Sequence, residues 1–244
     1  MLQNPGKALR KLLQGPDIIM APGIYDGISA RVAEQAGFPM GYLSGAGVAT
    51  GYLGEPDIGL TNGSDVADVA RRIAVKATTP FITDADTGYG NALNVIRTVW
   101  DLEMAGSAGI QLEDQAAPKR CGHLNGKQCI PAEEFAAKIR AAKYEKMYPE
   151  TVIVARTDAR AVYDLDEALR RGEMYLNAGA DVLFIEAPQT LEEIRKITET
   201  FRGIPLLTNQ VIGGKTPRLT AREMRNAVKQ PAQQRIREHH GHNA

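Results

Sequence analysis

The sequence contains only two cysteines, Cys121 and Cys129, and a single tryptophan in 244 residues. Two thiols eight positions apart do not form the disulfide framework of a secreted domain, so we expect reduced cysteines and a cytoplasmic protein. The 29 basic and 29 acidic residues leave no net charge, which argues against nucleic acid or an anionic membrane as the main partner. No apolar run approaches the roughly 20 residues that span a bilayer.

The first 14 residues carry basic side chains and no acids. This composition leaves targeting to an organelle, mitochondrial or peroxisomal, as the alternative to a cytoplasmic location. The spacing of Leu9, Leu12 and Leu13 instead favours a short amphipathic helix.

The rest of the chain alternates short apolar runs with helical patterns. Runs typical of buried strands lie at 17–21, 41–44, 80–83, 108–112, 152–155, 181–185 and 205–207. Helical spacing follows at 25–36, 63–77, 91–105, 132–147, 165–178, 190–201 and 220–228. This rhythm predicts seven parallel βα units in one domain, residues 1–228, and favours an α/β fold of the (β/α)8 TIM-barrel type over a doubly wound sheet. Residues 229–244 are predicted to form a polar, disordered tail.

Acids follow several of the predicted strands. Asp84 and Asp86 come after the third, Glu113 after the fourth and Glu186 after the sixth. In a barrel these strand ends surround one pocket, and carboxylates without a His/Cys cage favour a hard cation. Mg²⁺ fits best, with Mn²⁺ as the alternative ion. In the simpler interpretation each acid only caps the helix that follows its strand.

The stretch after the fourth strand carries a thiol between cations, Lys119-Arg120-Cys121-Gly122-His123. Neighbouring cations stabilise a thiolate, which predicts a reactive cysteine. The alternative is a polar surface loop with an incidental thiol. Cys129 and Trp100 are expected in the core instead.

These motifs resemble the isocitrate lyase/phosphoenolpyruvate mutase superfamily from about residue 15 to residue 224, and the thiol motif is the most specific of them. The other matching segments are 25–27, 44–47, 56–59, 84–90, 113–115, 155–159 and 213–217. Gln115 and Cys121 are typical of the carbon–carbon cleaving branch, which includes methylisocitrate lyase, 2,3-dimethylmalate lyase and oxaloacetate hydrolase. The phosphonate-forming mutases lack a cysteine in this loop.

The resemblance implies a metal site and a substrate pocket. It assigns Mg²⁺ to Asp84 directly and to Asp57, Asp86 and Glu113 largely through water. The implied substrate-binding residues are Ser44, Gly45, Ala46, Gly122, Glu186 and Asn209, the first three through backbone N–H groups that hold a carboxylate.

The same resemblance implies the catalytic residues. Cleaving a 2-hydroxy acid releases the enolate of a carboxylic acid, whose growing charge Arg156 and His123 would stabilise. Cys121 would protonate the enolate carbon, and Tyr42 is the candidate base for the hydroxyl group.

Two segments depart from the family pattern. Residues 209–212 read Asn-Gln-Val-Ile where the cleaving enzymes commonly read Asn-Met-Val-Glu. Residues 229–244 hold one strongly apolar side chain, Ile236, where the family continues into an eighth strand and further helices. We therefore expect a barrel without an ordinary eighth strand, of low stability, that aggregates or needs partner subunits and has reduced or absent activity. The resemblance itself implies a homo-oligomer, a tetramer in the family, which the altered C-terminus argues against.

The resulting hypothesis is a Mg²⁺-dependent lyase that cleaves a small 2-hydroxy di- or tricarboxylate to an α-oxo acid and a carboxylic acid. One alternative is hydrolysis of oxaloacetate to oxalate and acetate. The other is a truncated, inactive family member that binds a carboxylate or pairs with intact subunits.

Overall fold

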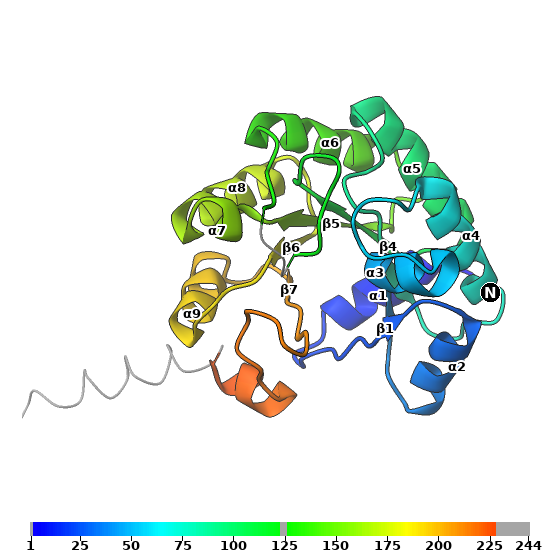
Figure 1. Cartoon of the computed structure of the whole chain (residues 1–244). Coiled ribbons are helices and arrows are strands. Elements are labelled where there is room, and N and C mark those ends of the chain that lie inside the picture. The colour runs from blue at the N-terminus through cyan, green and yellow to red at the C-terminus, as the bar shows by residue number, and fades with distance from the viewer. Residues whose placement is uncertain (1, 123–125, 228–244) are drawn as a thin grey trace, which may run out of the picture.

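The computed structural model describes residues 2–122 and 126–227 and shows a curled parallel sheet with helices on its outer side (Figure 1). The strands are β1 (Gly23–Ile24), β2 (Gly41–Leu43), β3 (Phe81–Asp84), β4 (Gly109–Glu113), β5 (Val152–Thr157), β6 (Val182–Ile185) and β7 (Leu206–Leu207). Within the described residues each strand pairs in parallel with the next, and β7 does not pair with β1. The barrel-type α/β fold expected from the alternating pattern is confirmed.

The helices follow the strands along the chain. They are α1 (Pro5–Leu13), α2 (Gly27–Gln35), α3 (Gly45–Val48), the π-helix η1 (Ala49–Leu53), α4 (Gly63–Ala74), α5 (Ala92–Met104), α6 (Ala132–Glu145), α7 (Ala159–Val162), α8 (Leu165–Asn177) and α9 (Leu191–Thr200), and residues 221–227 are also helical. Side-chain caps begin most of the long ones: Asn62 and Asn91, for example, each accept two backbone N–H groups of the first turn. None of these helices is long and apolar enough to cross a membrane.

The core lies in two layers. One joins the helices to the outer side of the sheet, and the other fills the inside of the curled sheet with side chains such as Val154 and Phe184. The inner layer is closed by Leu9 of α1, which is fully buried. Arg10 of the same helix donates to the carbonyl groups of Glu150 and Thr151, just before β5 begins. The predicted amphipathic helix therefore seals the amino-terminal end of the strands.

Two expectations about apolar residues are wrong, and one holds only in part. The run at 17–21 forms no strand, and the sheet ladder starts only when the Pro22 carbonyl accepts the Tyr42 N–H. Trp100 is 42% exposed on α5, where its Nε1–H reaches the Glu145 carbonyl at the end of α6. Cys129 is half-buried, at an antiparallel bridge to Gln115. Residues 229–244 lie outside the described residues.

Candidate active site

The carboxyl end of β3 delivers two buried acids, Asp84 and Asp86. Gln111 of the neighbouring β4 donates from Nε2 to Asp84 Oδ1 at 2.9 Å, and the Asp86 N–H donates to the same oxygen at 3.1 Å. Asp86 has a φ of +48°, a left-handed conformation that costs energy outside glycine and is typical of functional sites. The second oxygen of Asp84 faces Gly45, where an added Cβ would lie 3.1 Å away. The fold thus fixes one Asp84 oxygen and leaves the other turned to the start of α3.

A buried lysine brings a third acid to this place. The Lys119 ammonium contacts Asp57 and lies 2.6 Å from Asp86 Oδ1. Burial alone would lower the pKa of Lys119, but Asp86 and Asp84 together raise it above its ordinary value, so the ammonium stays charged. Asp57, which follows η1 in the chain, thereby joins the acids at the strand ends.

Arg156 is the centre of a second group of acids, at the ends of β5 and β6. Register places it beside Glu113 of β4, and its Nε lies 3.4 Å from Glu113 Oε2. The guanidinium also makes two contacts with Asp158, at 2.9 and 3.2 Å, and lies 3.7 Å from Glu186 Oε1. Burial opposes the charge, but Asp158 and the two glutamates raise the pKa of Arg156 well above its usual range.

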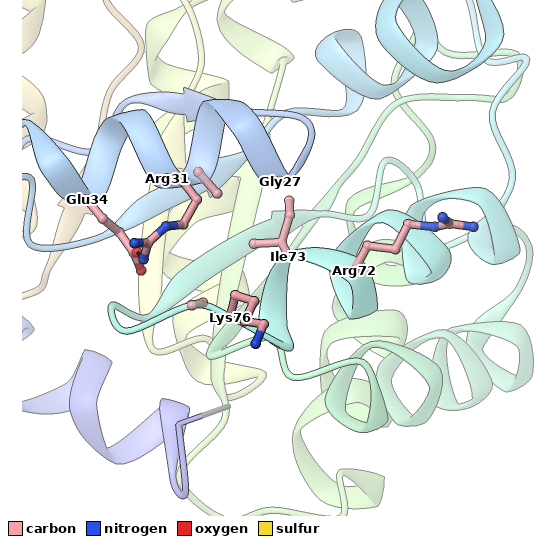
Figure 2. Close-up of a pocket in the computed structure, with 8 residues that line it drawn as sticks. Gly27, Arg31, Glu34, Arg72, Ile73 and Lys76 are labelled. Atoms are coloured by element: carbon pink, nitrogen blue, oxygen red, sulfur yellow. Dashed lines mark hydrogen bonds and ion pairs between the residues drawn. The ribbon is translucent and has the colours of Figure 1, made fainter.

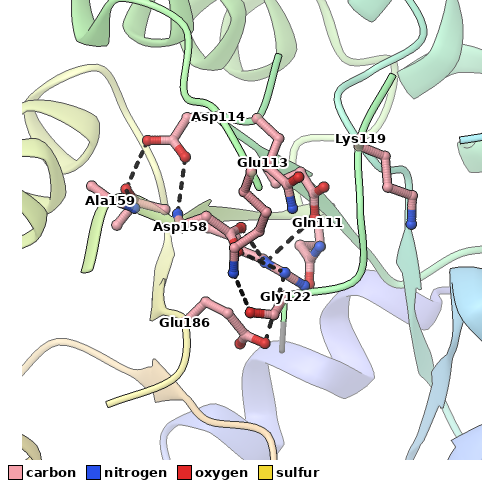
Figure 3. A network of polar contacts seen from close by, with 12 residues as sticks. Gln111, Glu113, Asp114, Lys119, Gly122, Asp158, Ala159 and Glu186 are labelled. Atoms are coloured by element: carbon pink, nitrogen blue, oxygen red, sulfur yellow. Dashed lines mark hydrogen bonds and ion pairs between the residues drawn. The ribbon is translucent and has the colours of Figure 1, made fainter. Parts of the chain in front are cut away.

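The loop after β4 returns to this group (Figure 3). Gly122 packs so closely that an added Cβ would lie 2.3 Å from both Arg156 Nη2 and Glu186 Oε1. The carbonyl of Gly122 accepts from the ammonium of Lys127, which also lies 2.9 Å from Asp158 Oδ1. The residue after Cys121 is therefore at the centre of the polar cluster.

The segment from Ser44 to Ala46 lies next to the β3 acids. The Ser44 N–H donates to the Ile24 carbonyl, and its side chain caps α3 by accepting the Gly47 N–H at 3.1 Å. Gly45 and Ala46 are the first residues of α3, where backbone N–H groups have no acceptor within the helix. Of the three predicted amides, that of Ser44 therefore already donates within the sheet, whereas those of Gly45 and Ala46 have no acceptor inside α3.

Tyr42 joins the same network from β2. Its hydroxyl group donates to Gln111 Oε1, so Tyr42, Gln111 and Asp84 form a chain across three strands. Burial, and then the charge of Asp84, raise the pKa of Tyr42 well above its ordinary value. At neutral pH the side chain is a phenol that donates a hydrogen bond.

A fully satisfied carboxylate, Asp114, lies behind the site. Its two oxygens accept from Thr157 Oγ1 at 2.7 Å, Arg171 Nη1 at 2.9 Å, Tyr175 Oη at 2.8 Å and the Asp158 N–H at 3.0 Å. Asp114 is completely buried. It therefore holds the end of β5 and α8 in register with β4 and has no spare oxygen for a ligand.

The predicted site residues thus fall into three groups. Those that the structure brings together at the strand ends are Asp57, Asp84, Asp86, Glu113, Arg156, Glu186, Tyr42, Gly45 and Gly122, with Ser44 and Ala46 beside them. Cys121 is half-buried next to Gly122, and Asn209 is half-buried after β7. His123 lies outside the described residues.

Three further residues of the cluster had no role in the sequence analysis: Gln111, Lys127 and Asp158. Gln111 and Asp158 are fully buried, and Lys127 nearly so. Polar residues inside or just after an apolar strand are the signal that could have identified the first two. Nothing in the sequence marks the Lys127 side chain as buried, since a lysine in a glycine-containing loop is usually exposed.

The charges of the cluster do not balance. Among the described residues six carboxylates (Asp57, Asp84, Asp86, Glu113, Asp158 and Glu186) meet three cations (Lys119, Lys127 and Arg156). Burial, and then Asp84, raise the pKa of Asp86 to about 7, and burial raises that of Glu113 well above its usual range. Within the part of the chain that the structure describes, Glu113 Oε1 has no hydrogen-bond partner. An added divalent cation would stabilise all these anions, so the donor set fits Mg²⁺.

The acids do not form a complete cage by themselves. Within the described residues no three His, Cys, Asp or Glu side chains converge closely enough to enclose a metal ion. Mg²⁺ usually keeps several waters and takes only one or two protein carboxylates, together with the substrate. An ion bound here would therefore keep part of its hydration shell.

A groove on the outside of the helix ring is separate from these acids (Figure 2). It lies between α2 and α4 and is lined by long side chains such as Arg31, Arg72 and Lys76. Glu34 within it accepts the backbone N–H groups of Thr78 and Thr79, which is a structural role. We find no arrangement there that would bind a specific ligand.

The family model described as phosphoenolpyruvate phosphomutase matches residues 9–228. The chain belongs to the phosphoenolpyruvate mutase/isocitrate lyase superfamily. The family expected from the thiol motif is therefore confirmed.

Relatives within this superfamily include carbon–carbon lyases. A 2,3-dimethylmalate lyase of Eubacterium barkeri is 45% identical over 91% of this chain and 76% of its own length. A 2-methylisocitrate lyase of Aeropyrum pernix is 46% identical over 93% of this chain and 72% of its own length.

Solved structures of the superfamily share the fold. An oxaloacetate acetylhydrolase in complex with 3,3-difluorooxalacetate superposes with a TM-score of 0.89 at 36% identity, over 96% of this chain and 84% of that one. A phosphonopyruvate hydrolase in complex with oxalate and Mg²⁺ superposes with a TM-score of 0.81 at 30% identity, over 97% and 85%.

Proposed function

We propose that this chain is a Mg²⁺-dependent carbon–carbon lyase that cleaves a small 2-hydroxy di- or tricarboxylate into an α-oxo acid and a carboxylic acid. The observation that carries the proposal is the position of Gly122 against Arg156 and Glu186. This position brings the loop that carries the Cys121 thiol to the strand ends where the acids meet. Protonation of an enolate requires a proton donor at such a place. Two lyases among the relatives support the same reaction class.

In the proposed reaction a general base, for which Tyr42 is the candidate, takes the proton of the 2-hydroxyl group, and the hydroxyl oxygen becomes the oxo group. The adjacent carbon–carbon bond breaks, and its electron pair forms the enolate of the departing carboxylic acid. The Cys121 thiol gives its proton to the enolate carbon. Mg²⁺, held by Asp84 with Asp86, Glu113 and Asp57 through water, would supply positive charge to the oxo-acid oxygens. A related hydrolase has been solved with oxalate and Mg²⁺.

The remaining residues bind and orient the substrate. The three acidic neighbours of Arg156 hold its guanidinium in place. In the proposed reaction this group would stabilise the negative charge that grows on the enolate. The amides of Gly45 and Ala46 would hold the oxo-acid carboxylate. Tyr42 carries its proton at neutral pH, so it could accept the hydroxyl proton only from its phenolate form, and its role as general base stays a prediction. Asn209 and His123 complete the proposed pocket.

A panel of two 2-hydroxy acids and one 2-oxo acid tests the proposal. Methylisocitrate, dimethylmalate and oxaloacetate would each be incubated with the protein and Mg²⁺, and release of pyruvate, glyoxylate and oxalate would be measured. Cys121→Ser should lower kcat by about 10²- to 10⁴-fold, the usual worth of a general acid, while substrate still binds. Cys129→Ser is the matched control and should keep full activity. The lyase assignment would be rejected if none of the substrates gave a product, whether or not EDTA was added.

The second candidate function is hydrolysis of oxaloacetate to oxalate and acetate. It is favoured by the structural similarity to an oxaloacetate acetylhydrolase. Release of oxalate and acetate from oxaloacetate, with no pyruvate or glyoxylate from the 2-hydroxy acids, would establish this reaction in place of the lyase.

A further inference from the structure

The loop that carries Cys121 ends in a buried lysine to which the proposed reaction gives no role. The side chain of Lys127 is only 2% exposed, and its ammonium lies 2.9 Å from Asp158 Oδ1. The same ammonium donates to the carbonyl of Gly122, five residues earlier in the chain. An ammonium taken out of water is costly unless it is paired, so a lysine at this position requires both partners.

Both partners of Lys127 are themselves fixed. Asp158 makes two contacts with the Arg156 guanidinium, and its N–H donates to the buried Asp114. Gly122 has no room to move towards the site, since even a methyl group there would overlap Arg156 and Glu186. Lys127 therefore joins the Gly122 carbonyl to a carboxylate that directly follows β5.

We propose that Lys127 is a positioning residue, whose ammonium ties the Gly122 carbonyl to Asp158 and thereby holds the adjacent Cys121 thiol at the carboxyl end of β5. The inference rests on the proposed function, because that function assigns the thiol its proton transfer. Lys127 itself touches neither substrate nor reacting atoms in this scheme. It acts by keeping the proton donor at the distance that the transfer requires.

Lysine suits this task because one ammonium has three donors and can reach two oxygens in different directions. Methionine keeps the length of the alkyl chain but has no donor. Arginine keeps the charge and the donors in a larger, planar group. These three side chains separate the effect of the tether from that of simple packing.

The other buried or half-buried lysines of the chain offer a matched control. Lys143 of α6 pairs with Asp181 at the same N–O distance of 2.9 Å, but Asp181 precedes β6, at the opposite end of the strands. Lys143→Met removes a comparable ion pair without touching the Cys121 loop.

The experiment measures two quantities in a Cys129→Ser background for the parent, Lys127→Met, Lys127→Arg and Lys143→Met. The first is the rate at which iodoacetamide alkylates Cys121, which requires no substrate. We expect it to rise about tenfold in Lys127→Met, equal to about 1.4 kcal/mol of easier local opening. The second is the split between kcat and KM, where kcat should fall about tenfold and KM should change less than about threefold.

Lys127→Arg should restore most of both values, and Lys143→Met should match the parent. If Lys127→Met fails to fold, Lys127→Gln, which keeps one donor group, replaces it and should show a smaller change in the same direction. Parent-like alkylation and kcat in a folded Lys127→Met protein would overturn the proposal. If the parent turns over none of the substrates but Cys121 is still alkylated faster in Lys127→Met than in the parent, the tether is supported and the proposed reaction is rejected.

Discussion

The two ends of the strands treat buried acids in opposite ways. At the amino-terminal end, Asp181 accepts the Ile153 N–H and pairs with Lys143 and Arg10, and although burial opposes its charge these partners lower its pKa. At the carboxyl end, burial, and then Asp84, raise the pKa of Asp86 to about 7. The acids at the amino-terminal end are fully paired, whereas Asp86 and Glu113 at the carboxyl end stay short of positive charge, although Asp114 beside them is satisfied.

This difference distinguishes acids that stabilise the fold from acids that are kept for a ligand. A protein can remove an uncompensated buried acid at no cost to packing, so its presence indicates that something else supplies the missing charge. The carboxyl end is also where barrel enzymes have their active sites, whereas the amino-terminal end serves stability. Substitution of an acid at the amino-terminal end should therefore lower stability and spare turnover, whereas substitution of a ligand acid at the carboxyl end should lower turnover and spare stability.

The largest effect is expected from Asp84→Ala. Turnover should fall about 10³-fold or more, because several kcal/mol of charge stabilisation depend on the cation. The melting temperature should stay the same or rise, because the substitution removes one negative charge from a cluster that has more acids than cations. Addition of Mg²⁺ should stabilise the parent, by about 2.7 kcal/mol at a hundred times Kd, but not this variant.

Asp181→Asn is the counterpart at the other end. It should lower the melting temperature through the loss of two ion pairs and leave kcat unchanged. Activity in Asp84→Ala that EDTA still abolishes would contradict the assignment of the metal to this acid.

Asp114→Asn should have the next largest effect. The amide leaves Arg171 without its buried carboxylate, which typically costs about 3–5 kcal/mol of unfolding free energy. Activity per folded molecule should also fall, because Asp114 holds the backbone of Asp158. Urea titration and steady-state kinetics measure the two effects.

Glu103→Gln is the control for Asp114. Glu103 is a buried acid at the opposite end that accepts from the Met147 and Tyr148 N–H groups and from Thr151 Oγ1. Its substitution should cost about 1.5–3 kcal/mol and spare kcat. Equal losses of kcat in the two variants would mean that Asp114 has no special link to the site.

The same comparison explains how far the sequence could be interpreted. The alternation of apolar runs and helical patterns predicts the barrel-type sheet, because strands buried on both faces are continuously apolar and their helices are amphipathic. It failed at 17–21, where the chain is apolar but makes no ladder before Pro22. The prediction that Trp100 lies in the core was wrong because helical spacing does not say how much of a large ring stays exposed.

For the site, residues in short motifs could be predicted and long-range partners could not. Asp84, Asp86 and Glu113 follow strands, so their common location comes from the topology. The contacts of Lys119 with Asp57, and of Lys127 with Asp158, depend on how a loop folds back on the sheet. No local pattern encodes such a return, so a sequence shows these lysines only as loop cations.

Leu9→Ala tests the sealed end, with a smaller expected effect than Asp114→Asn. Leu9 is fully buried against the inner layer of the sheet, and its Cδ2 lies 3.0 Å from where a Cβ on Gly109 would be. Removing its side chain should cost about 2–5 kcal/mol of unfolding free energy and leave kcat and KM unchanged. Leu12→Ala, at a partly buried position of the same helix, should cost less. A large loss of kcat in a folded Leu9→Ala protein would show that the two ends are coupled.

The smallest effect is expected from Glu167→Gln, at the outer edge of the Asp114 network. Glu167 accepts from Arg170 at 2.7 and 2.8 Å and from Arg171 Nε at 2.8 Å, and the Arg170 contacts above all lower its pKa to about 2. Because the folded pKa lies below the ordinary 4.5, this stabilisation is complete above about pH 4.5 and is lost as the pH falls towards 2. The pair is largely solvated, so the difference in unfolding free energy from the parent should stay under about 1 kcal/mol at pH 7 and shrink in acid. Urea titrations of both proteins between pH 7 and pH 3 measure it, with Glu173→Gln on the same helix as the control. A difference that stays constant over this range would mean that the substitution acts through packing instead of charge.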